Sequence, residues 1–300
     1  MIKEDWIGVM PAITTPFDDQ GAIDLGFMRR HARQMVEAGC TGLVTPGSLG
    51  EGGVLEPDEK RAIWQGLAEE LDGRAPVIAA VGALSTAEAV RIAVAAEASG
   101  CQGLMILPPY AYSGRWEETE AHFDAVLQAT PLSAMLYNNP VAYETDLRPD
   151  QIGVLADRYP NLHAVKESSG DLRRITAIRE ILGDRLAIFA GIDDLVVEAV
   201  SAGACGWIAG LVNALPVESV RLFELARNGQ VEECRTLYEW FLPLLRMDAV
   251  PEFVHLVKLC QQEFGLGSER LRLPRIPLRG PAREAALLAI AEAKMNHAAP

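Results

Sequence analysis

The stretch Ala38–Val44 reads AGCTGLV, and close variants of it return as SGCQGLM at Ser99–Met105 and as AGACGWI at Ala202–Ile208. In each copy, an amphipathic stretch ends at a glycine suited to the position just after a helix, where a positive φ angle costs little. A short apolar run with the length of a buried strand follows the glycine. This pattern is the helix-to-strand junction of an α/β protein, and its recurrence indicates that one unit is repeated along the chain.

Outward from these junctions, short apolar runs alternate with helical stretches. The strands that we expect are Gly8–Ile13, Leu43–Pro46, Val77–Val81, Gly103–Leu107, Ala134–Tyr137, His163–Lys166, Leu186–Ala190 and Cys205–Ala209. The helices that we expect are Leu25–Ala38, Pro57–Leu71, Thr86–Ala98, Trp116–Ala129, Pro149–Tyr159, Leu172–Leu182, Asp194–Ala202 and Pro216–Asn228. Continuous apolarity is typical of parallel strands covered on both faces. The alternation predicts an α/β fold, a (β/α)8 TIM barrel, with an open doubly wound sheet as the alternative.

The last part of the chain has a different pattern. After Gly229 the strand signals stop, and Val231–Leu245, Glu252–Phe264 and Ala282–Met295 have the pattern of helices. We therefore expect a barrel over residues 1–228 and a C-terminal helical region over 229–300, packed on the barrel.

Composition narrows the class of protein. About half of the residues are hydrophobic (49%), which is enough for a large core. The formal charge of −14 argues against a nucleic-acid partner, because phosphate recognition needs clustered Lys and Arg. Five cysteines without a C-x-x-C pair fit reduced, buried thiols. With no secretory signal and no apolar run long enough to cross a membrane, we expect a soluble cytoplasmic protein.

Lys166 is the first candidate for chemistry. Of the five lysines, it alone closes an apolar strand, after Ala164 and Val165. In a barrel of this type, reactive groups gather at the carboxyl ends of the strands. A partly desolvated lysine favours the neutral amine, which is nucleophilic toward a carbonyl carbon. The structural alternative is a lysine that reaches the barrel rim or pairs with Glu167 or Asp193.

Tyr137 closes the preceding strand, one barrel position away. Its phenol could carry protons between a lysine adduct and the substrate oxygen, whereas the structural alternative is a core tyrosine satisfied by backbone. After the second strand, the glycine-rich segment Pro46–Gly53 matches neither nucleotide-binding pattern, G-x-G-x-x-G or G-x-x-x-x-G-K-[ST]. It is expected to form a tight turn that offers backbone N–H groups and the Ser48 hydroxyl to a small anion, or a purely structural turn.

Metal and cofactor signals are absent from the sequence. The histidines have no metal-ligand spacing, and the pair Asp193-Asp194 stands where a helix is expected to begin, which favours capping over a cation site. We therefore expect no metal and no organic cofactor.

Taken together, three segments resemble the dihydrodipicolinate synthase / N-acetylneuraminate lyase family: GSLGE from Gly47, YNNP from Tyr137 and VKESSGD from Val165. Two further segments also match the family: PAITTPF from Pro11 and AGIDD from Ala190. The resemblance implies a homotetrameric barrel that forms a Schiff base with a small 2-oxo acid. It also implies roles for single residues: Lys166 forms the imine, Tyr137 relays protons, Ser48 with the Ser48 and Leu49 amides holds the carboxylate, and Gly47, Tyr110 and Ile208 adjoin the substrate.

Departures from the family pattern limit the range of reactions that we expect. Leu49 stands where family synthases carry a second threonine, and Ala111, flanked by Tyr110 and Tyr112, stands where a neighbouring subunit contributes a tyrosine. Ala142 stands where an arginine would meet a second carboxylate. We expect an apolar pocket without arginine, and hence a catabolic branch rather than lysine biosynthesis.

The stretches YNNPVAY and KESSGDLRRIT most resemble the branch that removes ammonia and water from a hydroxylated pyrroline carboxylate in hydroxyproline breakdown. A rival is aldol cleavage of a sugar-derived or aromatic pyruvate adduct. A hypothesis of another class is a barrel that binds a 2-oxo acid without catalysis, against which the presence of both Lys166 and Tyr137 argues.

Overall fold

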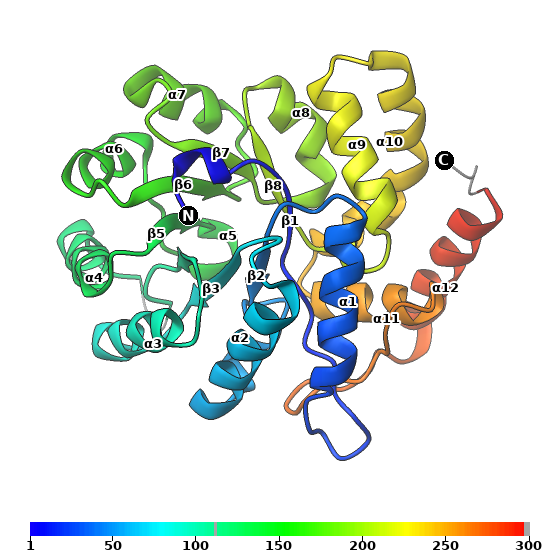
Figure 1. Cartoon of the computed structure of the whole chain (residues 1–300). Coiled ribbons are helices and arrows are strands. Elements are labelled where there is room, and N and C mark those ends of the chain that lie inside the picture. Colours follow the sequence, from blue (N-terminus) through cyan, green and yellow to red (C-terminus); the bar gives the residue numbers. More distant parts are fainter. Residues whose placement is uncertain (111–112, 297–300) are drawn as a thin grey trace.

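In the computed structural model, which describes residues 1–110 and 113–296, eight parallel strands form a barrel (Figure 1). The strands are β1 (Gly8–Pro11), β2 (Leu43–Thr45), β3 (Val77–Val81), β4 (Gly103–Ile106), β5 (Ser133–Asn138), β6 (Leu162–Glu167), β7 (Ala187–Ala190) and β8 (Gly206–Ala209). Their order is β1-β8-β7-β6-β5-β4-β3-β2, and a parallel bridge between Ala12 and Val44 joins the two ends. The fold is therefore the expected TIM barrel, and the open sheet is excluded.

Helices surround the barrel on its outside, most of them between successive strands and the last one after β8 (Figure 1). They are α1 (Leu25–Glu37), α2 (Pro57–Leu71), α3 (Thr86–Ala98), α4 (Trp116–Ala129), α5 (Pro140–Tyr143), α6 (Pro149–Arg158), α7 (Arg173–Leu182), α8 (Val196–Ser201) and α9 (Pro216–Arg227). The recurring glycines behave as expected: Gly39, Gly100 and Gly203 follow α1, α3 and α8 with φ angles of +106°, +87° and +111°. These positive angles explain why each junction carries glycine.

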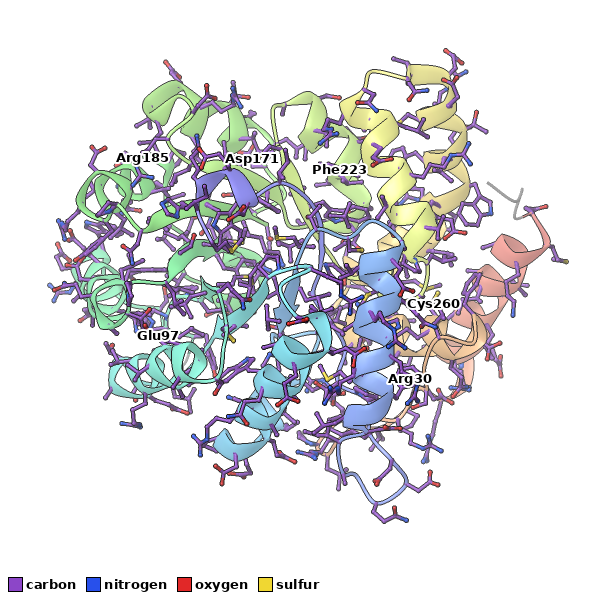
Figure 2. All side chains as sticks on the ribbon, in the orientation of Figure 1. Arg30, Glu97, Asp171, Arg185, Phe223 and Cys260 are labelled. Atoms are coloured by element: carbon purple, nitrogen blue, oxygen red, sulfur yellow. The ribbon has the colours of Figure 1, made fainter. Side chains whose placement is uncertain are left out.

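The core has two layers. One lies between the strands and the surrounding helices, and Phe223 on α9, labelled in Figure 2, belongs to it. The other fills the barrel interior with side chains such as Met10, Ile78 and Phe189. The N-terminal segment closes one end of this interior: Trp6 is buried, meets Phe189 edge to face, and its Nε1 donates to Ser133 Oγ at 2.7 Å. A ligand can therefore reach the interior from the opposite end, at the carboxyl ends of the strands.

Three further helices follow the barrel, α10 (Val231–Leu245), α11 (Phe253–Glu263) and α12 (Gly280–Met295), as the sequence predicts. They lie to one side of the barrel, with α10 against α9 and α11 near the segment that follows β8 (Figure 1). Cys260 of α11 is fully buried there (Figure 2). The division into residues 1–228 and 229–300 as separate units stays a prediction.

One local expectation is wrong, and one short helix was not expected. The pair Asp193-Asp194 does not cap its own helix; instead the buried Asp193 carboxylate accepts from Trp207 Nε1 and from the backbone N–H groups of Gly210 and Leu211. It thus stabilises the loop after β8. The four-residue helix α5 is also absent from the predicted elements. It forms because Pro140 occupies its first turn and the Asn139 side chain accepts from Ala142 N at 3.0 Å.

All five cysteines are free. Within residues 1–110 and 113–296, no helix is long and apolar enough to cross a membrane. In the same residues, no group of three or more His, Cys, Asp or Glu side chains is arranged to hold a metal ion.

Candidate active site

A cavity of about 590 Å³ opens at the carboxyl ends of the strands. Every site residue predicted from the sequence lines it: Gly47, Ser48, Leu49, Tyr110, Tyr137, Lys166 and Ile208. These residues come from five different strands or the loops that follow them, so the barrel brings together groups that are far apart in the chain. Ala111 and Tyr112, which the resemblance compared with a neighbouring subunit's tyrosine, lie outside the described residues.

Lys166 and Tyr137 are direct neighbours in the barrel. They are register partners on β6 and β5, and Lys166 Nζ lies 4.2 Å from the centroid of the Tyr137 ring. Both side chains are buried, with 7% and 6% of their surface exposed. Burial lowers the pKa of the Lys166 ammonium, which favours the neutral, nucleophilic amine. The same burial raises the pKa of the Tyr137 phenol, which keeps its proton available for transfer.

The suggested structural partners of Lys166 are occupied elsewhere. Glu167 accepts from Asn138 Nδ2 and from the backbone of Ser169, and Asp193 accepts from the groups described above. Within the described part of the chain, Lys166 Nζ has no hydrogen bond or ion pair. The amine is therefore turned toward the cavity without a structural partner.

A second buried lysine provides the contrast. Lys258 on α11 donates to Glu51 Oε1 at 2.8 Å and to the Thr15 carbonyl at 2.9 Å, and its Nζ lies 4.6 Å from the Phe17 ring centroid. Burial lowers the pKa of Lys258 as well, but Glu51 opposes that shift, and two acceptors engage the amine. Of the two buried lysines, only Lys166 faces the cavity.

The loop after β2 is shaped by close backbone contacts. A side chain on Gly52 would place its Cβ 2.3 Å from the Pro46 carbonyl oxygen, and one on Gly50 would lie 2.8 Å from the Ile13 carbonyl oxygen. The loop is closed by Glu51 N and Gly52 N, which donate to the carbonyls of Ser48 and Gly47. The backbone N–H groups of Ser48 and Leu49 donate to no acceptor in the described part of the chain. Two such groups side by side can bind one carboxylate.

Tyr143 is a site residue that sequence reasoning missed. Its phenol lies 2.5 Å from Ser48 Oγ, and its ring meets the Tyr137 ring edge to face with centroids 5.7 Å apart. Tyr110, 37% exposed, lies at the outer side of the same group, 6.1 Å from the Tyr143 ring. Tyr143 thus connects the loop after β2 with Tyr137. No signal at sequence level pointed to it, because the short helix α5 that carries it was not expected.

The expectation of a pocket without arginine is wrong. Arg275, from the segment between α11 and α12, lines the cavity, as does Lys60 from α2. Arg275 forms no ion pair with another described residue. The arginine expected after Tyr137 is replaced by Ala142, but a cation reaches the cavity from the C-terminal region instead. Asp248, which directly precedes the segment Ala249–Pro251 on the same wall, was missed as well.

Comparison with known proteins supports the resemblance. The model of the dihydrodipicolinate synthetase family matches residues 5–293. The chain belongs to this family. A 4-hydroxy-tetrahydrodipicolinate synthase of Pelobacter propionicus is 31% identical over 283 residues, which cover 94% of this chain and 97% of the relative. Relatives of this kind are lyases, and the coarse class of the chain is therefore a lyase of this family.

Solved structures agree with the fold of this family member. The 4-hydroxy-tetrahydrodipicolinate synthase of Methylacidiphilum fumariolicum has a TM-score of 0.92 at 29% identity and covers 96% of both chains. A dihydrodipicolinate synthase of Acinetobacter baumannii, crystallised with pyruvate, has a TM-score of 0.91 at 28% identity and covers 96% of this chain and 99% of that chain. The similarity extends over the barrel and the C-terminal helices.

Proposed function

We propose that the protein is a lyase that joins Lys166 to a small 2-oxo acid through an imine. The observation that carries this proposal is the buried Lys166 amine, unpaired in the described part of the chain, in contact with the Tyr137 ring and open to the cavity. Among lysine environments, this one favours attack on a carbonyl carbon. The rival hypothesis, a barrel that only binds a 2-oxo acid, does not explain why an unpaired amine lies next to a phenol in the cavity.

The surrounding groups supply the remaining requirements. The free N–H groups of Ser48 and Leu49, with the Ser48 hydroxyl, hold the substrate carboxylate. Lys166 Nζ then attacks C2, and the C2 oxygen leaves as water with protons carried by Tyr137. The imine withdraws electrons from C3, so a C3 proton can leave and an enamine forms. Tyr143 links Ser48 to Tyr137 and is positioned to pass protons toward the loop.

For the reaction itself, we propose a catabolic elimination, the loss of water and ammonia from a hydroxylated pyrroline carboxylate. Ala142 supports it, since it replaces the arginine that a second substrate carboxylate would meet, and Leu49 supports it because it lacks the hydroxyl of the second threonine that the synthases carry. The second candidate is condensation of pyruvate with an acidic aldehyde, as in a dihydrodipicolinate synthase. Arg275 supports it, because a cation on the cavity wall can bind the carboxylate of that aldehyde. Aldol cleavage stays the third candidate.

Exchange of the pyruvate methyl protons in D2O, followed by NMR, tests the imine without knowledge of the true substrate. The wild type is expected to exchange them through the enamine, and Lys166→Ala is expected to be inactive. Exchange by Lys166→Ala at the wild-type rate would overturn the proposal. A turnover assay with the hydroxylated pyrroline carboxylate, acylpyruvates, deoxy-sugar acids and pyruvate with an acidic aldehyde then separates the candidate reactions.

We also propose that the protein is a homotetramer, as the family resemblance implies. Sedimentation velocity at assay concentrations checks it, and a monomer would contradict it.

A further inference from the structure

Asn139 connects the catalytic tyrosine with the short helix α5. It directly follows β5, is half-buried and lines the cavity. Its side chain makes two hydrogen bonds of different kinds. Oδ1 accepts from the backbone N–H of Ala142 at 3.0 Å and so caps α5. Nδ2 donates to the hydroxyl oxygen of Tyr137 at 2.9 Å. One end of the amide is therefore bound to the backbone, and the other end contacts the phenol that we expect to carry protons.

The helix cap determines which way the Asn139 amide points. A backbone N–H can only donate, so the amide oxygen must face Ala142 N and the NH2 group must face Tyr137. The Tyr137 oxygen is consequently the acceptor in this hydrogen bond. Its own proton is left for another acceptor. The amide thus orients the phenol as a proton donor.

The hydrogen bond from Asn139 also favours negative charge on the Tyr137 oxygen. A donor that points at an oxygen stabilises the ionised form more than the neutral form. Burial raises the pKa of the Tyr137 phenol, and the hydrogen bond from Asn139 opposes this rise. Without it, the buried phenol would release its proton less readily.

We propose that Asn139 is a positioning residue for the imine chemistry, which orients the Tyr137 hydroxyl and stabilises the phenolate that exists between two proton transfers. The inference rests on the proposed imine at Lys166. Asn139 acts through the Tyr137 oxygen, and contact between its amide and the substrate is not required.

The proton transfers show where the phenolate arises. Attack of the Lys166 amine on C2 gives a carbinolamine. Its hydroxyl group takes the Tyr137 proton and leaves as water, while the electron pair of the nitrogen forms the C2–N double bond. A protonated imine and a phenolate result, and their charges balance. The phenolate then takes a proton from C3, and the electrons of that C–H bond form the neutral enamine. Between these transfers, the charged oxygen lies within hydrogen-bond distance of Asn139 Nδ2.

Two substitutions separate this role from the helix cap. Serine and aspartate are both good N-cap residues, so Asn139→Ser and Asn139→Asp keep an acceptor for Ala142 N. Serine removes the donor to Tyr137, whereas aspartate replaces it with an acceptor that would bind the Tyr137 proton. We expect Asn139→Ser to lower kcat for pyruvate methyl exchange about 10- to 100-fold and Asn139→Asp to lower it further. KM should change less than about threefold, because Lys166 and the loop after β2 are untouched.

A double variant and a matched control complete the test. Tyr137→Phe has no hydroxyl group for Asn139 to contact, so adding Asn139→Ser to it should lower kcat no further. Asn161 also carries an amide donor, which bonds the Leu127 carbonyl at 3.0 Å just before β6, at the other end of the barrel. Asn161→Ser should therefore keep the wild-type kcat and KM.

The outcomes distinguish this inference from the proposed function. A fall in kcat that is present in Asn139→Ser and absent from the Tyr137→Phe background supports it. Wild-type kcat in both Asn139→Ser and Asn139→Asp overturns it and leaves the imine intact. A loss that keeps its full size in the Tyr137→Phe background makes Asn139 a structural residue, and a rise in KM without a fall in kcat makes it a substrate-binding residue; either result overturns the inference. Absence of exchange in the wild type refutes the imine and this role with it.

Discussion

Replacing Lys258 by methionine removes the cation of a buried ion pair that joins the C-terminal region to the loop after β2. Both partners are essentially inaccessible, at 1% for the Lys258 side chain and 0% for that of Glu51. Methionine fills nearly the same volume, so the change is mainly electrostatic. Glu51 is left as a buried carboxylate with one remaining contact, from Arg272 N at 3.2 Å, and the Thr15 carbonyl loses its donor.

The expected cost follows from this arrangement. Breaking a buried pair by removing one partner destabilises a protein by about 3 to 5 kcal/mol, because the other charge stays buried. Adding Glu51→Gln removes that charge, and the double variant should recover about 2 kcal/mol of the loss. Binding should weaken as well, since Glu51, at a φ angle of +55°, closes the turn that carries Ser48.

Equilibrium unfolding in urea measures the free energy of unfolding, with saturable inhibition by a non-reacting 2-oxo acid analogue as the binding assay. Lys294→Met is the matched control from the same region, because Lys294 bonds the Glu263 carbonyl at the surface. It should cost less than about 1 kcal/mol. A loss below about 1 kcal/mol for Lys258→Met, or a double variant less stable than the single one, would refute the reasoning.

Tyr137→Phe should still form the imine but lose turnover by about 10²- to 10⁴-fold, since proton transfer is removed; unchanged turnover excludes its role. Tyr143→Phe should slow pyruvate methyl exchange and shift its pH profile, whereas Tyr159→Phe, which loses a hydrogen bond from Gln128 far from the cavity, should do neither. Burial lowers the pKa of His31 to about 4, so the unfolded chain binds a proton there first as the pH falls. The free energy of unfolding should therefore fall by about 3 kcal/mol between pH 6.5 and pH 4. Urea unfolding measured across that range should show this pH-dependent decrease in the wild type and not in His31→Gln.

The barrel could be predicted from sequence because its signals are local. Glycine at the helix-to-strand junctions and continuous apolar runs are properties of a few adjacent residues, and the observed strands begin or end within a few positions of the expected ones. The same holds for Lys166 and Tyr137, which stand at strand ends. In a parallel barrel, residues at the carboxyl ends of two neighbouring strands lie side by side.

The missed residues depend on contacts that no local pattern encodes. Tyr143 reaches the site only through a four-residue helix, which is too short to have a period. Asp248 and Arg275 come from the C-terminal region, and their approach to the cavity depends on how that region packs on the barrel. The wrong expectation for Asp193 has the same origin, because its partners Gly210 and Leu211 follow a different strand.

Trapping of the imine tests most directly whether Lys166 reacts with a 2-oxo acid. The protein is incubated with pyruvate, reduced with borohydride and digested, and the modified lysine is identified by mass spectrometry of the peptides. We expect one reduced pyruvate adduct, on Lys166, that disappears in Lys166→Ala and persists in Tyr137→Phe. An adduct on Lys258, an adduct that survives Lys166→Ala, or no adduct with any 2-oxo acid would contradict it.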